Sequence, residues 1–252
     1  MEERNYLAES LIIRARDFKE SDKIVTFFSR EKGKRSAIAK GVRKPKSSLR
    51  GVVQPFCHTN LALAKGRGSL DVITQGETID SFSSLREDLD KIAHASYIAE
   101  LIDAGMPEGK AGEDVFWLAL AAFSLMSMSD DLSLPTHFFE LRFLSQLGLT
   151  PQLSACCACG RRVEGASFFL SGLRGGIVCA SCHGANSGLI GAGTVQMMRK
   201  MREVELPKLL TLRINPQMEK EMTMAINGYL DYHLDYALKA RALLKQLSEN
   251  QE

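Results

Sequence analysis

Two pairs of cysteines constrain the fold of this chain more than any other feature. They follow the pattern C-x2-C, nineteen intervening residues, and C-x2-C, formed by Cys156, Cys159, Cys179 and Cys182. Each short pair presents two thiolates, and the segment between the pairs can fold back so that four sulfurs form a tetrahedral shell. Because Zn²⁺ prefers four soft ligands in this geometry, and no coordination position stays open, the spacing predicts one structural zinc ion.

Other interpretations of the cysteines stay open. Disulfide bonds are typical of secreted proteins, whereas residues 1–5 lead into no apolar stretch of a signal peptide. A thioredoxin-like redox site needs one C-x2-C pair rather than two, and inert or degenerate cysteines are the remaining alternative. We interpret Cys157 as a buried small side chain or a spare thiol, His183 as a substitute ligand, and Cys57 as a core residue.

The composition is that of an ordinary globular protein. Of 252 residues, 45% are hydrophobic and 25% are charged, and this length allows two or three modest domains. No hydrophobic stretch approaches the roughly 20 residues that a bilayer-spanning helix needs. With reduced cysteines and no targeting segment, we expect a cytoplasmic protein that has no membrane partner.

Charge is unevenly distributed along the chain. Residues 1–70 hold 16 Lys and Arg against 7 Asp and Glu, whereas residues 71–150 hold 4 against 14. A dense group of cations is typical of a phosphate-binding surface, although a solvated face or a flexible basic loop without a partner has the same composition. The densest group lies in residues 30–50, and we predict that its cations bind the phosphates of a nucleic acid: Arg30, Lys32, Lys34, Arg35, Lys40, Arg43, Lys44, Lys46 and Arg50.

Residues 5–82 have the pattern of a small β-barrel. Alternating and β-branched segments separated by turn residues predict five short strands. A hairpin turn is expected at Gly33, and a loop between Gly41 and Gly51. Five such strands are typical of an OB-type barrel, and an SH3-like barrel would have a similar pattern. The strands are expected at residues 7–14, 23–28, 35–40, 52–63 and 70–74.

Helical periodicity begins after the barrel. Ser84 and Glu87 form a capping box for a first helix, whose apolar face includes Leu85 and Leu89. Further helices are expected at 113–128, from Pro135, and from 193 to 203. Asn215 as N-cap and Pro216 at the first helical position begin a last long helix. Its expected buried side contains Met218, Met222, Ile226, Tyr229, Tyr236, Leu243 and Leu247.

These segments together predict an α+β multidomain protein. An N-terminal five-stranded OB-type β-barrel is followed by a helical body into which a four-cysteine zinc module is inserted. The expected domains are residues 1–82 for the nucleic-acid-binding barrel, 83–150 for the first part of the helical body, 151–190 for the zinc module, and 191–252 for the C-terminal part of the body.

Motifs of several enzyme classes are missing from the sequence. It contains no G-x-x-x-x-G-K-[ST] loop of ATPases, no complete dinucleotide-binding glycine motif and no H-x-E of zinc deaminases. The five histidines are scattered and form no catalytic pattern. We therefore expect a protein that is not an enzyme and that acts without ATP.

Several local sequences carry a more specific resemblance. The longest is ESDKIVTFFSREKGK at residues 20–34, followed by AKGVRK at 39–44, KSSLRG at 46–51 and QPF at 54–56, with ASYIAEL at 95–101 and GLTP at 148–151. With the order of barrel, helical body and cysteine module, these sequences resemble the bacterial RecO family of recombinational-repair mediators. The additional Cys157 departs from the family pattern.

The resemblance implies a role without catalysis. Proteins of this family bind single- and double-stranded DNA and anneal complementary strands. They act with RecR, and in some cases RecF, to load RecA on strands coated with single-strand-binding protein, so a location at the nucleoid in the cytoplasm follows. Cations on the barrel would supply phosphate contacts, which carry little sequence information.

Two other functions remain as alternatives. A zinc-ribbon regulator that reads a specific duplex sequence would need a recognition helix with exposed Arg, Asn or Gln. The segment around the cysteines offers Arg161, Arg162 and Arg174 but no evident helix of this kind. An RNA-binding OB protein would have a similar charge distribution.

Overall fold

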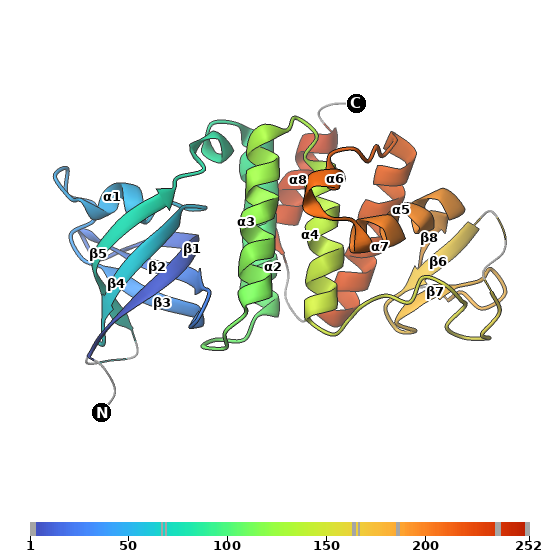
Figure 1. The fold of residues 1–252 in the computed structure, drawn as a ribbon, viewed down its shortest axis with the longest axis horizontal. Helices are drawn as coiled ribbons and strands as arrows, with labels where there is room; N and C mark the ends of the chain where they lie inside the picture. The colour runs from blue at the N-terminus through green and yellow to red at the C-terminus, as the bar shows by residue number, and fades with distance from the viewer. Residues whose placement is uncertain are drawn as a thin grey trace. The chain divides into compact units, whose positions relative to one another are not determined.

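The computed structural model describes residues 4–249 apart from Arg67, Ser69, Val163, Glu164, Ala166, Ala185, Asn186 and residues 235–237. The chain divides into two compact units. Unit 1 comprises Met1–Asp130 and Leu238–Glu252, and unit 2 comprises Asp131–Ala237 (Figure 1). The expected Tyr236 contact of the last helix therefore lies outside the described residues.

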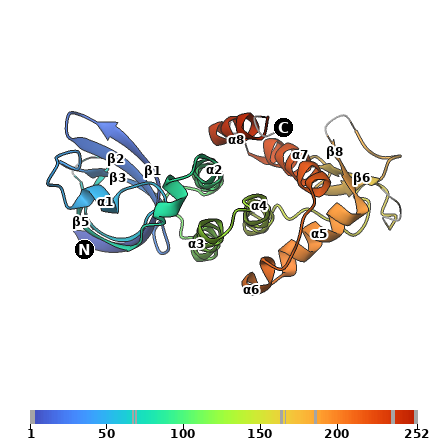
Figure 2. The same ribbon diagram turned by 90° about the horizontal axis from the view of Figure 1, so that it is seen from above.

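Unit 1 begins with five strands that close into a barrel in the order β1-β2-β3-β5-β4 (Figure 2). β1 pairs antiparallel with both β2 and β4, and β3 pairs parallel with β5, which closes the ring. A register shift between Ile12 and Arg14 lets the long β1 bend from one neighbour to the other. The strands are β1 (Asn5–Phe18), β2 (Asp22–Ser29), β3 (Gly33–Ala39), β4 (His58–Ala64) and β5 (Asp71–Asp80).

Strand β2 is buried on both faces, which explains its continuous run of β-branched and aromatic residues. Val25 and Phe27 belong to the core cluster inside the barrel. Phe28, on the other face, is fully buried and lies close to Gly112, just before helix α3 (Glu113–Met128). A strand that is buried on both faces carries apolar residues at most positions rather than at alternate ones.

The segment between β3 and β4 differs from the prediction of a strand at 52–63. A short helix, α1 (Leu49–Val52), occupies its start, and β4 begins only at His58. Phe56, with a φ of 72°, turns the chain before β4. Val52 and Val53 of the predicted strand instead fill the barrel core from this segment, together with Val42 and Leu49 of the predicted loop.

The other helical elements that the structure describes in unit 1 are η1 (Ser83–Arg86), α2 (Leu89–Gly105) and α8 (Lys239–Glu249). The predicted capping box is wrong, because Ser84 lies in the 3-10 turn η1 and Asp88 caps α2 by accepting a hydrogen bond from the Lys91 amide at 2.9 Å. Leu89 consequently lies at the exposed start of α2 and is 57% exposed. The predicted bounds of α3 are confirmed.

Unit 2 combines helices with a small sheet of order β7-β6-β8. Helix α7 packs against this sheet, where Gly188 and Gly172 allow close approach of Ala225 and Tyr232. The elements are α4 (Ser133–Gln146), β6 (Ser167–Ser171), β7 (Gly176–Val178), β8 (Ser187–Gly191), α5 (Ala192–Glu203), α6 (Leu206–Leu209) and α7 (Pro216–His233).

The last predicted helix has a confirmed start and a wrong length. The side chain of Asn215 accepts a hydrogen bond from the Met218 amide at 2.9 Å, and Pro216 is the first helical residue. α7 ends at His233, and the residues that were assigned to its continuation form α8 in unit 1. There, the Ala240 amide donates to Glu100 of α2 at 2.8 Å. No helix within the described ranges is both long and hydrophobic enough to span a bilayer.

The turn glycine Gly33 supplies a test of the fold. Its φ is +65°, and a Cβ atom there would lie 1.9 Å from the Lys110 carbonyl oxygen. Gly41, in the same unit, has a φ of +63° but only the flexible Lys44 side chain nearby. We expect Gly41→Ala to lower the free energy of unfolding by about 1–2 kcal/mol from backbone conformation alone. Gly33→Ala should cost roughly 2 kcal/mol more, because backbone must also move.

Urea denaturation of both variants measures this difference. Equal losses of unfolding free energy would show that the close approach of Gly33 to Lys110 does not contribute to the cost of the substitution.

Candidate nucleic-acid interface and metal centre

The four predicted ligand cysteines come together in unit 2. The Sγ atoms of Cys156, Cys159, Cys179 and Cys182 all lie within 4.8 Å of one another, and those of Cys159 and Cys179 are 3.9 Å apart. Four sulfurs bound tetrahedrally at 2.3 Å would be spaced by roughly 3.8 Å. The donor set and its spacing therefore fit a metal ion that prefers thiolates.

The thiols of this cluster are unequal in acidity. Burial opposes ionisation of Cys156, but hydrogen bonds from the backbone amides of Cys179, Cys159 and Ala158 outweigh it and lower its pKa to about 6. Hydrogen bonds to Cys179 and Cys159 raise the pKa of Cys182 to about 12. A bound metal would take the place of the thiol protons of this cluster.

The two neighbouring candidates lie outside the cluster. The Cys157 sulfur is 4.0 Å from the Ala155 carbonyl oxygen and borders Gly176. The His183 ring stacks on Phe169 with the ring centroids 4.0 Å apart. Neither side chain replaces one of the four cysteines. Cys57, in unit 1, is fully buried in the barrel core, as predicted.

The predicted DNA-binding cations fall into two groups. In the first group, the side chains already interact with other residues of unit 1. Arg30 forms ion pairs with Glu9 at 3.0 Å and Glu31 at 2.8 Å. Lys34 pairs with Asp103 at 3.3 Å and is only 18% exposed, and Arg35 is half-buried beside Tyr6. The ion pairs of Arg30 and the Tyr6 contact of Arg35 thus lie within the barrel, whereas Lys34 joins the barrel to α2.

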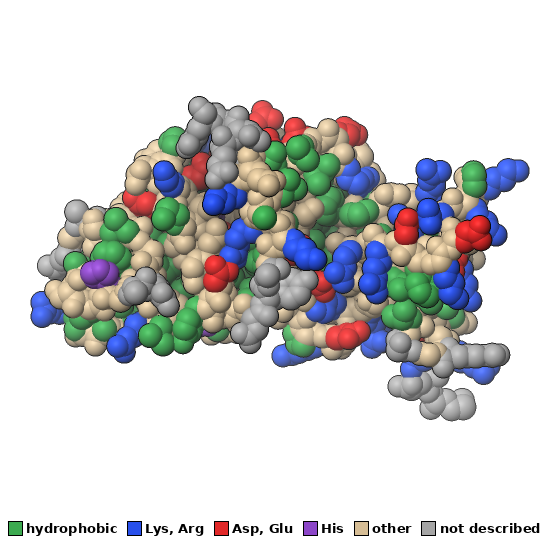
Figure 3. All heavy atoms as spheres, turned by 180° about the vertical axis from the view of Figure 1, so that it is seen from behind, with side chains coloured by type: hydrophobic (Ala, Val, Ile, Leu, Met, Phe, Trp, Pro, Cys, Tyr) green, Lys and Arg blue, Asp and Glu red, His purple; other side chains and the backbone are tan. Residues whose placement is uncertain are grey.

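The second group is exposed. Lys32 lies at the β2–β3 turn, with its ammonium 5.9 Å from the Tyr6 ring centroid. The others follow one another along the segment between β3 and β4, which we call the cationic segment (residues 40–50). Figure 3 shows Lys and Arg side chains gathered over the barrel and the adjoining part of unit 1. The exposed members of the cationic segment are Lys40, Arg43, Lys44, Lys46 and Arg50.

Backbone hydrogen bonds attach the cationic segment to the β1–β2 turn. The Gly41 amide donates to the Asp22 carboxylate at 2.8 Å, and the Arg43 amide donates to the Ser21 carbonyl oxygen at 3.0 Å. The hydrogen bond from Gly41 lowers the pKa of Asp22 below its ordinary value of 3.8. The loop that the sequence predicted is therefore anchored at its start, and its buried Val42 and Leu49 hold it to the barrel.

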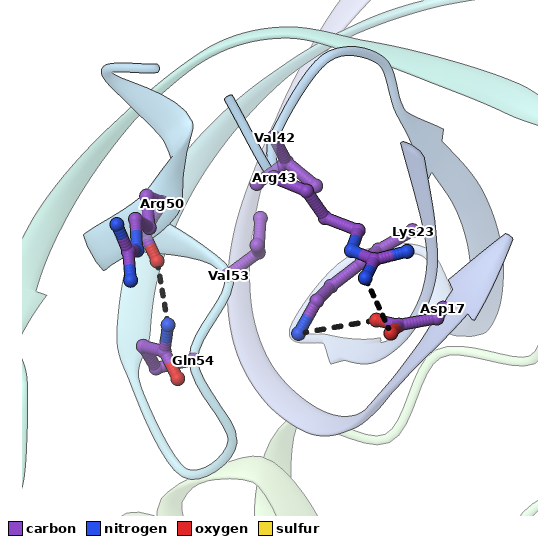
Figure 4. Close-up of a pocket in the computed structure, with 7 residues that line it drawn as sticks. All are labelled: Asp17, Lys23, Val42, Arg43, Arg50, Val53 and Gln54. Atoms are coloured by element: carbon purple, nitrogen blue, oxygen red, sulfur yellow. Dashed lines mark hydrogen bonds and ion pairs between the residues drawn. The ribbon is translucent and has the colours of Figure 1, made fainter. Parts of the chain in front are cut away.

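A pocket of about 270 Å³ opens between the β1–β2 hairpin and α1. On one wall, Lys23 and Arg43 point towards Asp17, at distances of 3.7 and 3.4 Å from its carboxylate oxygens (Figure 4). Arg50 and Gln54 lie on the opposite wall, with Val42 and Val53 between the walls (Figure 4).

Sequence reasoning missed Lys23, since it lies within a strand away from the dense cationic run. Its pairing with Asp17 across the β1–β2 hairpin is the signal that could have placed it beside Arg43.

The fold and these two sites define a class of protein in which a basic five-stranded barrel is combined with a helical unit that carries a four-cysteine cluster. Two family models match the chain. The model of the recombination protein O N terminal matches residues 1–82, and that of the recombination protein O C terminal matches residues 86–242.

Named relatives agree with these matches. The chain is 38% identical to the DNA repair protein RecO of Pelotomaculum thermopropionicum, covering 97% of this chain and 95% of the relative. It is 32% identical to the DNA repair protein RecO of Desulforamulus reducens, covering 96% and 94%. It is 38% identical to that of Heliobacterium modesticaldum, covering 88% and 83%. The chain belongs to the RecO family of DNA repair proteins.

The anchor between Asp22 and Gly41 supplies a test. Because the pKa of Asp22 is lowered in the folded protein, its bond to Gly41 is fully present above the ordinary pKa and is lost as pH falls through the lowered value. Asp22→Asn should speed hydrogen exchange of the Gly41 amide at neutral pH, because a neutral amide oxygen is the weaker acceptor. Amide exchange measured by NMR checks this, and unchanged exchange at Gly41 would contradict the anchor.

Proposed function

We propose that this protein binds single- and double-stranded DNA through the exposed cations of its barrel and anneals complementary strands without nucleotide hydrolysis. The observation that carries the proposal is the cationic segment, because five exposed cations on an anchored stretch of backbone form a fixed positive surface. Lys and Arg on such a surface neutralise phosphates of two strands and offset their repulsion.

We also propose that the barrel is of the OB type. The strand order β1-β2-β3-β5-β4 with a parallel β3–β5 pair supports this assignment, since an OB-fold is a five-stranded Greek-key barrel that binds oligonucleotides. In this interpretation, residues 1–82 are the nucleic-acid-binding domain, residues 83–150 and 191–252 are the helical body, and residues 151–190 are the zinc module.

The metal of the cysteine cluster is proposed to be one structural Zn²⁺ held by Cys156, Cys159, Cys179 and Cys182. Four thiolates match the preference of zinc and leave no position for a substrate. Four thiolates more than neutralise one Zn²⁺, and the excess negative charge partly cancels the module's cations Arg161, Arg162 and Arg174. The module is therefore a structural element, and the principal DNA contacts belong to the barrel.

The alternative of a sequence-specific zinc-ribbon regulator has less support. Between the two cysteine pairs, the described residues form strands β6 and β7 rather than a helix that could enter a major groove. The RNA-binding alternative is weakened by the relatives, which are named as DNA repair proteins.

Family membership supports a wider role for this chain. We infer that it acts as a mediator with RecR, and in some cases RecF, to load RecA on DNA coated with single-strand-binding protein. No enzymatic activity is part of this role, and the site of action is the nucleoid in the cytoplasm. An annealing assay with complementary oligonucleotides, in the absence of ATP and with naked and protein-coated strands, tests the proposal. Strands that anneal no faster than in buffer would refute it.

Zinc binding leads to a prediction on the cysteines. Cys156→Ser should lower the zinc content from one ion per chain and increase hydrogen exchange in residues 150–190, because a closed four-thiolate shell loses one ligand. Cys157→Ser is the matched control and should keep its zinc, since the Cys157 sulfur lies outside the cluster. Metal analysis of both purified variants checks this. Zinc loss in the control would show that the ligand assignment is wrong.

The cationic segment leads to a prediction on salt dependence. Lys44→Glu with Lys46→Glu should weaken binding of every DNA sequence alike and reduce the annealing rate, because interactions with phosphates carry no base information. The slope of log K against log salt should become shallower by about 0.7 for each single-strand phosphate that the variant no longer neutralises.

The matched comparison for this variant lies in the zinc module. Alanine at Arg161, Arg162 and Arg174 should reduce annealing less at the same salt concentration. An equal or greater loss from the module variant would move the principal DNA site away from the barrel.

A further inference from the structure

We propose that the pocket between the β1–β2 hairpin and α1 holds one backbone phosphate of the bound strand, with Lys23, Arg43 and Arg50 acting on the same phosphate. This inference rests on the proposed DNA-binding function and assigns it a defined subsite. The remaining exposed cations of the cationic segment would each meet separate phosphates along the strand.

The pocket contains more hydrogen-bond donors than its one carboxylate can accept from. Three cations line it against one carboxylate, Asp17. The ion pairs of Lys23 and Arg43 with Asp17 are long, at 3.7 and 3.4 Å, and Asp17 is 57% exposed. An ammonium has three donors and a guanidinium has five, so most of the donors on this wall are free for an anion. A phosphodiester offers the acceptors that such donors prefer.

The walls of the pocket are fixed by the fold. Lys23 lies in β2 directly opposite Asp17 of β1, and the Arg43 amide is held by the Ser21 carbonyl oxygen at 3.0 Å. On the other wall, the Gln54 side chain donates to the Arg50 carbonyl oxygen at 2.8 Å. Val42 and Val53 are each only 2% exposed. An anion that binds here therefore restricts the backbone less than it would in a flexible loop.

The lining favours a phosphate over a base. Single-strand proteins hold bases by stacking them on aromatic side chains, whereas none of the seven lining residues is aromatic. The apolar surface is limited to the two valines between the walls. What the pocket offers is positive charge from two sides, which suits the anionic backbone that all sequences share.

Convergence on one phosphate has a measurable consequence. Cations that share a ligand are energetically coupled, so their substitutions are not additive, whereas cations that meet separate phosphates behave independently. Arg43 and Arg50 lie on opposite walls of one pocket, and Lys44 and Lys46 lie outside it. The two pairs come from the same cationic segment, so they form a matched comparison with the same change of charge.

The experiment measures binding of a single-stranded oligothymidylate over a range of salt concentrations. Arg43→Gln, Arg50→Gln and their double variant form one cycle, and Lys44→Gln, Lys46→Gln and their double variant form the control cycle. We expect the fold-loss of the Arg43/Arg50 double variant to differ clearly from the product of its single losses. Its salt slope should fall by about 0.7 at most, the value for one phosphate, because Lys23 still faces that phosphate, and the slope of the control double variant should fall by about 1.4.

The possible results separate the subsite from the wider function. If the losses in the first cycle multiply and its salt slope also falls by about 1.4, as for two separate phosphates, the pocket holds no shared phosphate, while DNA binding by the barrel stands. If neither double variant weakens binding, both the subsite and the proposed function are wrong. Urea denaturation of each variant confirms that the barrel is folded before the affinities are compared.

Discussion

The burial of four apolar side chains from the segment between β3 and β4 is the interaction on which the candidate interface depends. Val42, Leu49, Val52 and Val53 fill the barrel core, although none of them belongs to a barrel strand. Without this burial, the cations on the same segment would lie on a mobile loop, and ordering that loop would oppose every binding event. The barrel therefore gains both part of its core and a fixed positive surface from one stretch of chain.

Local sequence signals predicted several elements correctly because the deciding interactions are local. Asn215 and Pro216 mark the start of α7, the apolar spacing of residues 113–128 gives α3, and Gly33, at the expected hairpin turn, has a positive φ. The cysteine spacing placed four thiols in one cluster, since short C-x2-C turns leave few other arrangements. The resemblance to the RecO family, based on longer sequence stretches, is confirmed.

The errors arose where distant residues decide the structure. An apolar stretch at 52–57 resembles a strand by composition, but it fills the barrel core from a turn. The capping box expected at Ser84 is an exception, because the competing N-cap residue, Asp88, lies only four residues further along the chain. Charge density could not distinguish Lys34, which is paired with Asp103 of α2, from the exposed Lys44. The tertiary contacts of each cation are needed to distinguish charges that are paired within the fold from charges that are exposed to a ligand.

Helix α8 has a consequence for the order in which the protein forms. It packs on α2 within unit 1, yet its residues follow all of unit 2 in the chain. During synthesis the barrel and the first two long helices emerge early, but the α2 surface that α8 covers stays bare until more than a hundred further residues have been added. Unit 2 can fold in that interval, since domains generally fold as units during translation. Unit 1 can therefore be completed only after the whole of unit 2 has been synthesised.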